Sequence, residues 1–127
     1  MNDRQTYKFV IVDDDKAILR LMATLLEQRG HRTVLFHAGT AAVIEIPNEK
    51  PDCVITDLTM VGVDGLELVR DLRATPAMGD VKIVMVTSKA DAASQAEAED
   101  AGIDGFIGKP FDANTFAMRV EDVLSGG

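Results

Sequence analysis

The hydrophobic residues of the chain form short continuous runs separated by longer mixed segments. Five runs, rich in Val and Ile and too short for helices, span residues 9–12, 33–36, 53–55, 81–86 and 106–107. Continuous apolar runs of this length are typical of strands that are buried on both faces, as in a parallel sheet. A sheet with one face in water would instead alternate apolar and polar residues, and these runs do not alternate.

The mixed segments between the runs carry helical patterns. In the clearest of them, apolar residues recur at spacings of three and four, which is the period of an amphipathic helix. The predicted helices are 18–26, followed by Gly30; 40–46, ending before Pro47; 66–72, ending before Pro76; 90–101, ending at Gly102; and 116–124, capped by Asp112.

Strand and helix thus alternate five times along the chain. This order predicts right-handed crossovers and an α/β fold, a doubly wound five-stranded parallel sheet with five helices. The length of 127 residues favours one domain, 1–127, with a core at about 8–124.

The charge and cysteine content of the chain narrow the classes of function that it can have. The chain has 13 Lys and Arg against 21 Asp and Glu, a net charge of −8. An acidic surface repels phosphate backbones and anionic lipid, so we expect no direct nucleic-acid binding and no membrane binding. No apolar run approaches the roughly 20 residues that span a bilayer, so a cytoplasmic protein is expected. The single cysteine, Cys53, lies in a predicted buried strand and is assigned to the core.

Polar residues follow four of the five predicted strands. They are Asp13, Asp14 and Asp15 after the first, Thr56 and Asp57 after the third, Thr87 and Ser88 after the fourth, and Lys109 and Pro110 after the fifth. Because ligands bind outside the carboxyl ends of the strands in open parallel sheets, these residues are expected to share one site.

The chemistry of this set points to a metal ion and an anion. Crowded carboxylates repel one another, and a hard divalent cation such as Mg²⁺, which prefers oxygen ligands, relieves that repulsion. A lone lysine supplies a compact positive charge for an anion. Together these residues indicate a place for a metal and a phosphoryl group beside a nucleophilic carboxylate.

The same residues resemble those of a response regulator receiver domain. The matching motifs are Val12-Asp13-Asp14, Asp57-Leu58-Thr59-Met60 with Asp64-Gly65, Thr87-Ser88 and Lys109-Pro110-Phe111. The resemblance covers residues 8–124 and implies a flavodoxin-like fold with strand order 2-1-3-4-5. It also implies a phosphorylation-dependent signalling switch that acts on itself and is not a turnover enzyme.

The resemblance implies a role for each matching carboxylate. Asp57 is the expected phosphoacceptor, which receives its phosphoryl group from a phosphohistidine of a sensor histidine kinase or a phosphotransfer protein. Mg²⁺ is expected to bind Asp14, Asp57 and the backbone carbonyl of Thr59 directly, and Asp13 largely through a water.

It also implies how the phosphoryl group is held and sensed. Thr87 and Lys109 are expected to hydrogen-bond the phosphoryl oxygens, and Thr87 and Phe106 form the expected switch. The Lys109–Pro110 peptide bond is expected to be cis. A downstream protein or dimer mate is expected on the face made by the fourth helix, fifth strand and fifth helix; no output domain is expected within the chain.

Two further positions and one loop are singled out by the same resemblance. Thr59 and Lys89 are expected to tune the lifetime of the phosphoryl group. Proline usually follows the methionine of the loop in this family, whereas this chain has Val61 and Gly62, so a less stiff loop is expected.

Other interpretations of the same residues remain open at this point. Asp13 and Asp14 suit a helix N-cap, Asp15 is expected to be a cap or first-turn acid, and Lys109 suits a salt bridge to Asp57. A haloacid dehalogenase-like, Mg²⁺-dependent phosphatase would use Asp13 and Asp15 but leave Asp57 unexplained. A flavin-binding module would need a phosphate loop rich in hydroxyls and glycine, which these strand ends lack.

Overall fold

Five parallel strands form the central sheet of the protein. The computed structural model describes residues 5–60 and 63–126. The strands are β1 (Lys8–Val12), β2 (Arg32–Phe36), β3 (Cys53–Thr56), β6 (Lys82–Thr87) and β7 (Gly105–Gly108). They pair in the order β2-β1-β3-β6-β7. Counting only the strands of this sheet, this is the predicted order 2-1-3-4-5, and all five apolar runs are confirmed as strands.

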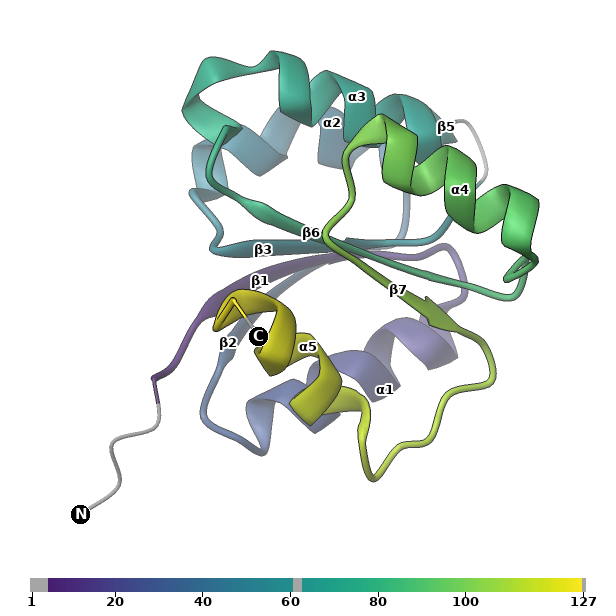
Figure 1. Cartoon of the computed structure of the whole chain (residues 1–127). Coiled ribbons are helices and arrows are strands. Elements are labelled where there is room, and N and C mark those ends of the chain that lie inside the picture. Colours follow the sequence, from purple (N-terminus) through teal and green to yellow (C-terminus); the bar gives the residue numbers. More distant parts are fainter. Residues whose placement is uncertain (1–4, 61–62, 127) are drawn as a thin grey trace.

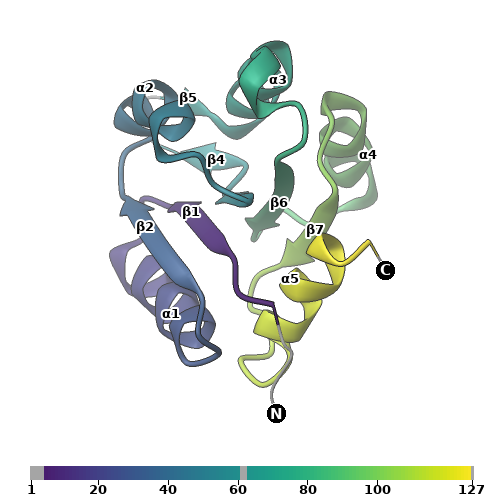
Figure 2. The same cartoon turned by 90° about the vertical axis from the view of Figure 1, so that its left-hand side faces the viewer.

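Helices cover both faces of the sheet (Figures 1 and 2). One face carries α1 (Lys16–Glu27) and α5 (Phe116–Leu124). The other carries α2 (Gly39–Glu49), α3 (Gly65–Ala74) and α4 (Ala92–Ala101). The predicted doubly wound α/β architecture is therefore confirmed.

The core consists of two apolar clusters, one on each face of the sheet. In β1, Phe9 and Ile11 pack against α1 and α5, whereas Val10 and Val12 pack toward α2 and α3. Successive side chains of a strand point to opposite faces, so a strand covered on both faces must be apolar at every position. This explains why the runs of the central strands β1, β3 and β6 are continuous. The expected burial on both faces is wrong for the edge strand β2, where Leu35 is 37% exposed.

All five predicted helices are present, but only α5 has the predicted bounds; α1 and α3 are slightly longer than predicted, and α2 and α4 differ for identifiable reasons. Pro47 was expected to follow the end of the second helix, but it lies inside α2. Proline removes one backbone donor, yet Ala42 and Ile46 remain fully buried on this helix, and their packing holds the segment together. The helix ends instead at Glu49, and its C-cap, Lys50, adopts a left-handed conformation with φ 51°. The fourth helix begins at Ala92 rather than residue 90, because Asp91 is its N-cap.

Asp112 was expected to cap the last helix, and this is wrong. The helix begins at Phe116, and its N-cap, Thr115, makes no side-chain cap hydrogen bond. The Asp112 carboxylate instead accepts the backbone N–H of Asn114 at 2.8 Å, within the turn that precedes the helix.

A short antiparallel hairpin follows β3 and was not predicted. It consists of β4 (Thr59–Met60) and β5 (Val63–Asp64), and Asp64 then caps α3 by accepting the Leu66 N–H at 2.8 Å. Val61 and Gly62, where a less stiff loop was expected, lie outside the described residues.

A charged cluster ties the turn after α1 to α5. The guanidinium of Arg29 donates two hydrogen bonds of 2.7 Å to the Glu121 carboxylate. His31 Nδ1 accepts the Tyr7 N–H at 3.0 Å, so the proton of the neutral ring lies on Nε2, which donates to Glu121 at 2.6 Å. His31, to which the sequence assigned no role, is therefore a buried structural residue.

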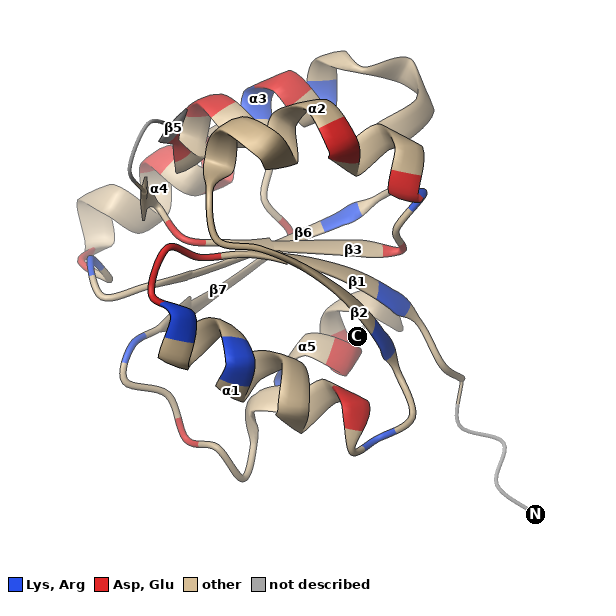
Figure 3. Ribbon diagram, turned by 180° about the vertical axis from the view of Figure 1, so that it is seen from behind, with Lys and Arg blue, Asp and Glu red and all other residues tan. Residues whose placement is uncertain are grey.

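Acidic residues mark the turn between β1 and α1, and α1 itself contains both basic and acidic residues (Figure 3). This acidic turn lies at the carboxyl edge of the sheet. Within residues 5–60 and 63–126, no helix is both long and apolar enough to cross a lipid bilayer.

Candidate functional site

Backbone hydrogen bonds position three of the predicted site residues at the carboxyl edge of the sheet. Each continues the ladder by one step, donating its N–H to the last carbonyl of a neighbouring strand: Asp13 to Phe36 (3.1 Å), Asp57 to Val12 (3.3 Å) and Lys109 to Thr87 (2.8 Å). The main chain therefore places these side chains on rigid strand ends, as the sequence predicted.

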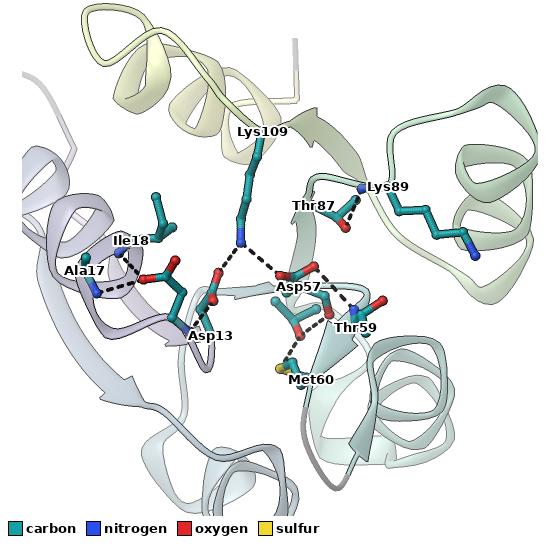
Figure 4. Close-up of polar contacts among 11 residues, drawn as sticks. Asp13, Ala17, Ile18, Asp57, Thr59, Met60, Thr87, Lys89 and Lys109 are labelled. Carbon is teal, nitrogen blue, oxygen red and sulfur yellow. Dashed lines mark hydrogen bonds and ion pairs between the residues drawn. The ribbon is translucent and has the colours of Figure 1, made fainter.

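The three side chains meet in one ion cluster (Figure 4). The Lys109 ammonium lies 2.7 Å from Asp13 Oδ2 and 2.9 Å from Asp57 Oδ2. Asp13 is fully buried, and Asp57 is 8% exposed. The expected salt bridge between Lys109 and Asp57 is confirmed, and Asp13 shares the same ammonium.

Burial and pairing act in opposite directions on these groups. Burial raises the pKa of the Asp13 carboxyl above its ordinary value, although the Lys109 ammonium and the Asp15 N–H counteract part of this effect. Burial also lowers the pKa of Lys109, but its hydrogen bonds to Asp13 and Asp57 outweigh burial, so that pKa is raised. The lysine therefore stays charged and acts as the fixed cation of the site.

The other two acids of the first strand end differ from Asp13. The Asp15 carboxylate accepts the N–H groups of Ala17 (3.0 Å) and Ile18 (3.2 Å), which confirms it as the cap of α1. Asp14 is exposed and lines an open cleft. The other residues that line this cleft are Asp13, Asp15, Ile18, Asp57, Ser88, Lys109 and Pro110.

The cleft suits a hard cation by its chemistry. Asp13, Asp14 and Asp57 bring three carboxylates, and Lys109 is the one cation among the residues that line the cleft. As the side chains stand, no group of three His, Cys, Asp or Glu in the described part of the chain is close enough to hold a metal ion together. Mg²⁺ needs only one or two carboxylates and keeps several waters, so the donor set fits it.

The expected switch and rate-tuning residues surround Asp57 but do not all point at it. The Thr87 hydroxyl is buried and accepts the Lys89 N–H at 3.1 Å. The Thr59 N–H donates to Asp57 Oδ1 at 3.3 Å. The Lys89 side chain extends away from Asp57 (Figure 4) and, with Thr59, lines a separate hollow beside α4.

Two expectations about the end of the site can be compared directly with the structure. The Lys109–Pro110 peptide bond is cis, which confirms the prediction. Phe106 is half-buried and packs against the cluster that contains Met85 and Ala98. Phe106 therefore lies on the face of the sheet that α4 covers.

Gly65 supports the site in a way that residue pattern alone did not reveal. A Cβ added at this glycine would lie 2.1 Å from the Asp57 carbonyl oxygen and 2.8 Å from Leu58 Cα. Its N–H donates to the Leu58 carbonyl at 2.9 Å. The first residue of α3 thus packs directly against the backbone that carries Asp57, and only a residue without Cβ fits.

The fold and this arrangement of strand-end residues define the class of the protein. The model of the response regulator receiver domain family matches residues 9–121, and the chain belongs to this family. It is 35% identical over 122 residues to a chemotaxis protein CheY homolog of Campylobacter jejuni, covering 94% of each chain.

Solved structures agree with this assignment. A CheY-like response regulator receiver domain protein of Methanospirillum hungatei has a TM-score of 0.85 and 26% identity, covering 96% of each chain. The chemotaxis response regulator CheY4 of Vibrio cholerae has a TM-score of 0.88 over 94% of this chain and 99% of its own. At 24% identity, this second likeness supports the fold.

Proposed function

We propose that the protein is a phosphorylation-dependent switch of two-component signalling and that Asp57 is its phosphoacceptor. The donor is a phosphohistidine of a sensor histidine kinase or a phosphotransfer protein. The observation that carries the proposal is the position of the Asp57 carboxylate. It lies at the end of a central strand, at the wall of an open cleft, and it is held by Lys109 at 2.9 Å.

The transfer exchanges one bond for another. A carboxylate oxygen of Asp57 forms a bond to phosphorus while the bond from phosphorus to the donor histidine nitrogen breaks. The histidine keeps the electron pair and takes up a proton. When bound, Mg²⁺ would supply positive charge that offsets the charge of the phosphoryl group. Asp14, Asp57 and the Thr59 carbonyl would hold the ion directly, and Asp13 would hold it through a water.

Lys109 and Thr87 then hold the product. The phosphoryl group carries about −1.5 to −2 charges and replaces the single charge of the Asp57 carboxylate, so the site, which already contains Asp13 and Asp14, becomes more negative. The Lys109 ammonium is already within 3 Å of the Asp57 carboxylate and needs little movement to reach a phosphoryl oxygen. Thr87 must turn from its present contact with the Lys89 N–H, and this turn is the proposed start of the switch.

The output surface is the face formed by α4, β7 and α5. If Thr87 moves toward Asp57, it vacates space beside Phe106, and the ring can turn inward. This couples a local charge change to a surface that a downstream protein or dimer mate can read. In this scheme the protein phosphorylates and dephosphorylates itself and does not turn over an external substrate.

The haloacid dehalogenase-like alternative is less consistent with the geometry. It requires Asp13 and Asp15 to act together on a substrate, but Asp15 is engaged as the N-cap of α1. It also leaves unexplained why Asp57 shares an ammonium with Asp13.

Intact-mass measurement tests the proposal. The protein is incubated with acetyl phosphate and Mg²⁺, and its mass is compared with that of Asp57→Asn treated in the same way. We expect the mass of one phosphoryl group on the wild type, lost in base and absent without Mg²⁺, and none on the variant. Equal labelling of the two proteins would contradict the assignment of Asp57.

A further inference from the structure

Helix α4 is attached to the rest of the molecule by little buried surface. Of its residues, only Ser94 and Ala98 are buried. Hydrophobic stabilisation grows with the apolar area that is buried, so two small side chains stabilise the packing of this helix weakly. Polar contacts at its two ends therefore decide how it is held.

The carboxyl end of α4 is held by one arginine of α3. Arg73 Nε donates to the Gly102 carbonyl at 2.9 Å, Nη1 to the Val81 carbonyl at 2.8 Å and Nη2 to Asp104 Oδ2 at 2.7 Å. The Asp104 carboxylate also accepts the Ile83 N–H at 2.8 Å. One planar guanidinium thus joins α3, the start of β6 and the segment from α4 to β7.

Gly102 leaves space for the Arg73 side chain because it has no Cβ. Its φ of +116° lies in the left-handed region, where side chains are strained. A Cβ at this position would also lie 3.0 Å from Arg73 Cγ and 3.2 Å from Arg73 Nε. The residue therefore both turns the chain and leaves room for the guanidinium, so the contact is built into the backbone.

The amino end of α4 is held differently. The Asp91 carboxylate accepts the Ser94 N–H at 3.0 Å, a bond that closes within the helix itself. The loop that leads from β6 into this end contains a local hydrogen bond from the Lys89 N–H to the Thr87 hydroxyl at 3.1 Å, two residues along the chain. A Thr87 side chain that turns toward Asp57 carries this acceptor away from Lys89.

We propose that Arg73 makes the carboxyl end of α4 a fixed pivot, so that movement of Thr87 displaces the amino end, residues 89–94, and leaves residues 102–104 in place. The inference rests on the proposed function, because a phosphoryl group on Asp57 is what moves Thr87. Arg73 is then a positioning residue of the switch: it holds the carboxyl end of α4, whereas Thr87 acts at the amino end.

Amide hydrogen exchange, with and without beryllofluoride and Mg²⁺ as the phosphoryl mimic, tests the pivot. In the wild type we expect the mimic to change exchange at least fivefold at residues 89–94 and less than twofold at residues 102–104. In Arg73→Met, exchange at residues 102–104 is expected to rise at least tenfold without the mimic. With the mimic, the change is expected to extend along the whole helix.

Two further variants sharpen the test. Arg70→Met removes an exposed arginine from the same helix and is expected to behave as the wild type. Asp104→Asn weakens the charged contact but retains an oxygen for the Ile83 N–H, and it is expected to give a smaller effect in the same direction as Arg73→Met. It also provides a readout if Arg73→Met does not fold.

The outcomes separate the pivot from the proposed function. Equal changes at both ends of α4 in the wild type, at full occupancy of the mimic, would overturn the pivot. So would unaltered exchange at residues 102–104 in folded Arg73→Met, or in Asp104→Asn if Arg73→Met does not fold. If the mimic does not bind, the proposed function and its trigger both fail, whereas the exchange of the variants without the mimic still measures what Arg73 holds.

Discussion

Replacing Gly65 by alanine should displace the backbone of the phosphoacceptor. The new methyl group would be placed 2.1 Å from the Asp57 carbonyl oxygen, 2.8 Å from Leu58 Cα and 2.9 Å from the Leu58 carbonyl oxygen. All three are backbone atoms, so no side-chain rotation can relieve the contact. The strain must be absorbed by the loop after β3 or by the first turn of α3.

The size of the effect follows from these distances. Reaching even 3.0 Å requires the Asp57 carbonyl to move by roughly 0.9 Å (3.0 minus 2.1). Forcing an extra methyl group into a packed region costs about 1–3 kcal/mol. Because backbone atoms make all of the close contacts here, this substitution should cost about 3 kcal/mol. With a urea m-value of about 1–3 kcal/mol/M, the unfolding midpoint should fall by about 1–3 M.

The rate at which Asp57 is phosphorylated should fall as well, because a displacement of about 1 Å at a reacting group can lower a rate about a hundredfold. Urea unfolding followed by circular dichroism, and the rate of mass increase with acetyl phosphate, measure the two effects. Gly79→Ala is the matched control: its Cβ would meet the Pro76 carbonyl at an ordinary 3.5 Å, and φ there is −60°. An unfolding midpoint and labelling rate of Gly65→Ala equal to those of Gly79→Ala would refute the reasoning.

Three further outcomes are expected. The hydrogen bond from the Arg29 guanidinium lowers the pKa of Glu121 below its ordinary value of 4.5. The contribution of this carboxylate to stability is therefore complete above pH 4.5, and it is lost as the pH falls through the lower pKa of the folded state. Denaturant unfolding should show Glu121→Gln to be less stable by about 1 kcal/mol at pH 7, and the difference should shrink toward pH 3. Asp14→Asn should weaken Mg²⁺ binding in a titration more than Asp15→Asn does; equal effects would move the metal site. Substitutions of Thr59 and Lys89, singly and together, should change the dephosphorylation rate and change the stability by less than about 0.5 kcal/mol. A dephosphorylation rate that stays within error would rule out a rate-tuning role for the two residues.

The sheet was predictable because its central strands β1, β3 and β6 are covered on both faces. Val10 faces one helical layer and Ile11 the other, so the strand carries no polar interruption in the sequence. Helix boundaries were less predictable because tertiary packing overrides local signals. Pro47 is a local stop signal, but burial of Ile46 outweighs the loss of one hydrogen bond.

The site was predictable as far as it depends on strand ends. Asp13, Asp57 and Lys109 follow directly from the rule that parallel strands deliver their carboxyl ends to one edge. The support from Gly65 and the fork of Arg73 depend instead on close contacts between segments distant in the sequence. Gly65 belongs to a motif that the sequence matched, but neither contact leaves a periodic signature, so the packing itself is visible only in the structure.

Locating the labelled residue tests the central claim most directly. An acyl phosphate is reduced by borohydride to an alcohol, which marks the aspartate that carried the phosphoryl group and survives peptide mapping by mass spectrometry. After treatment with acetyl phosphate and Mg²⁺, we expect the reduced residue at position 57. Reduction at Asp13 or Asp15, with residue 57 unchanged, would contradict the account and favour the phosphatase alternative.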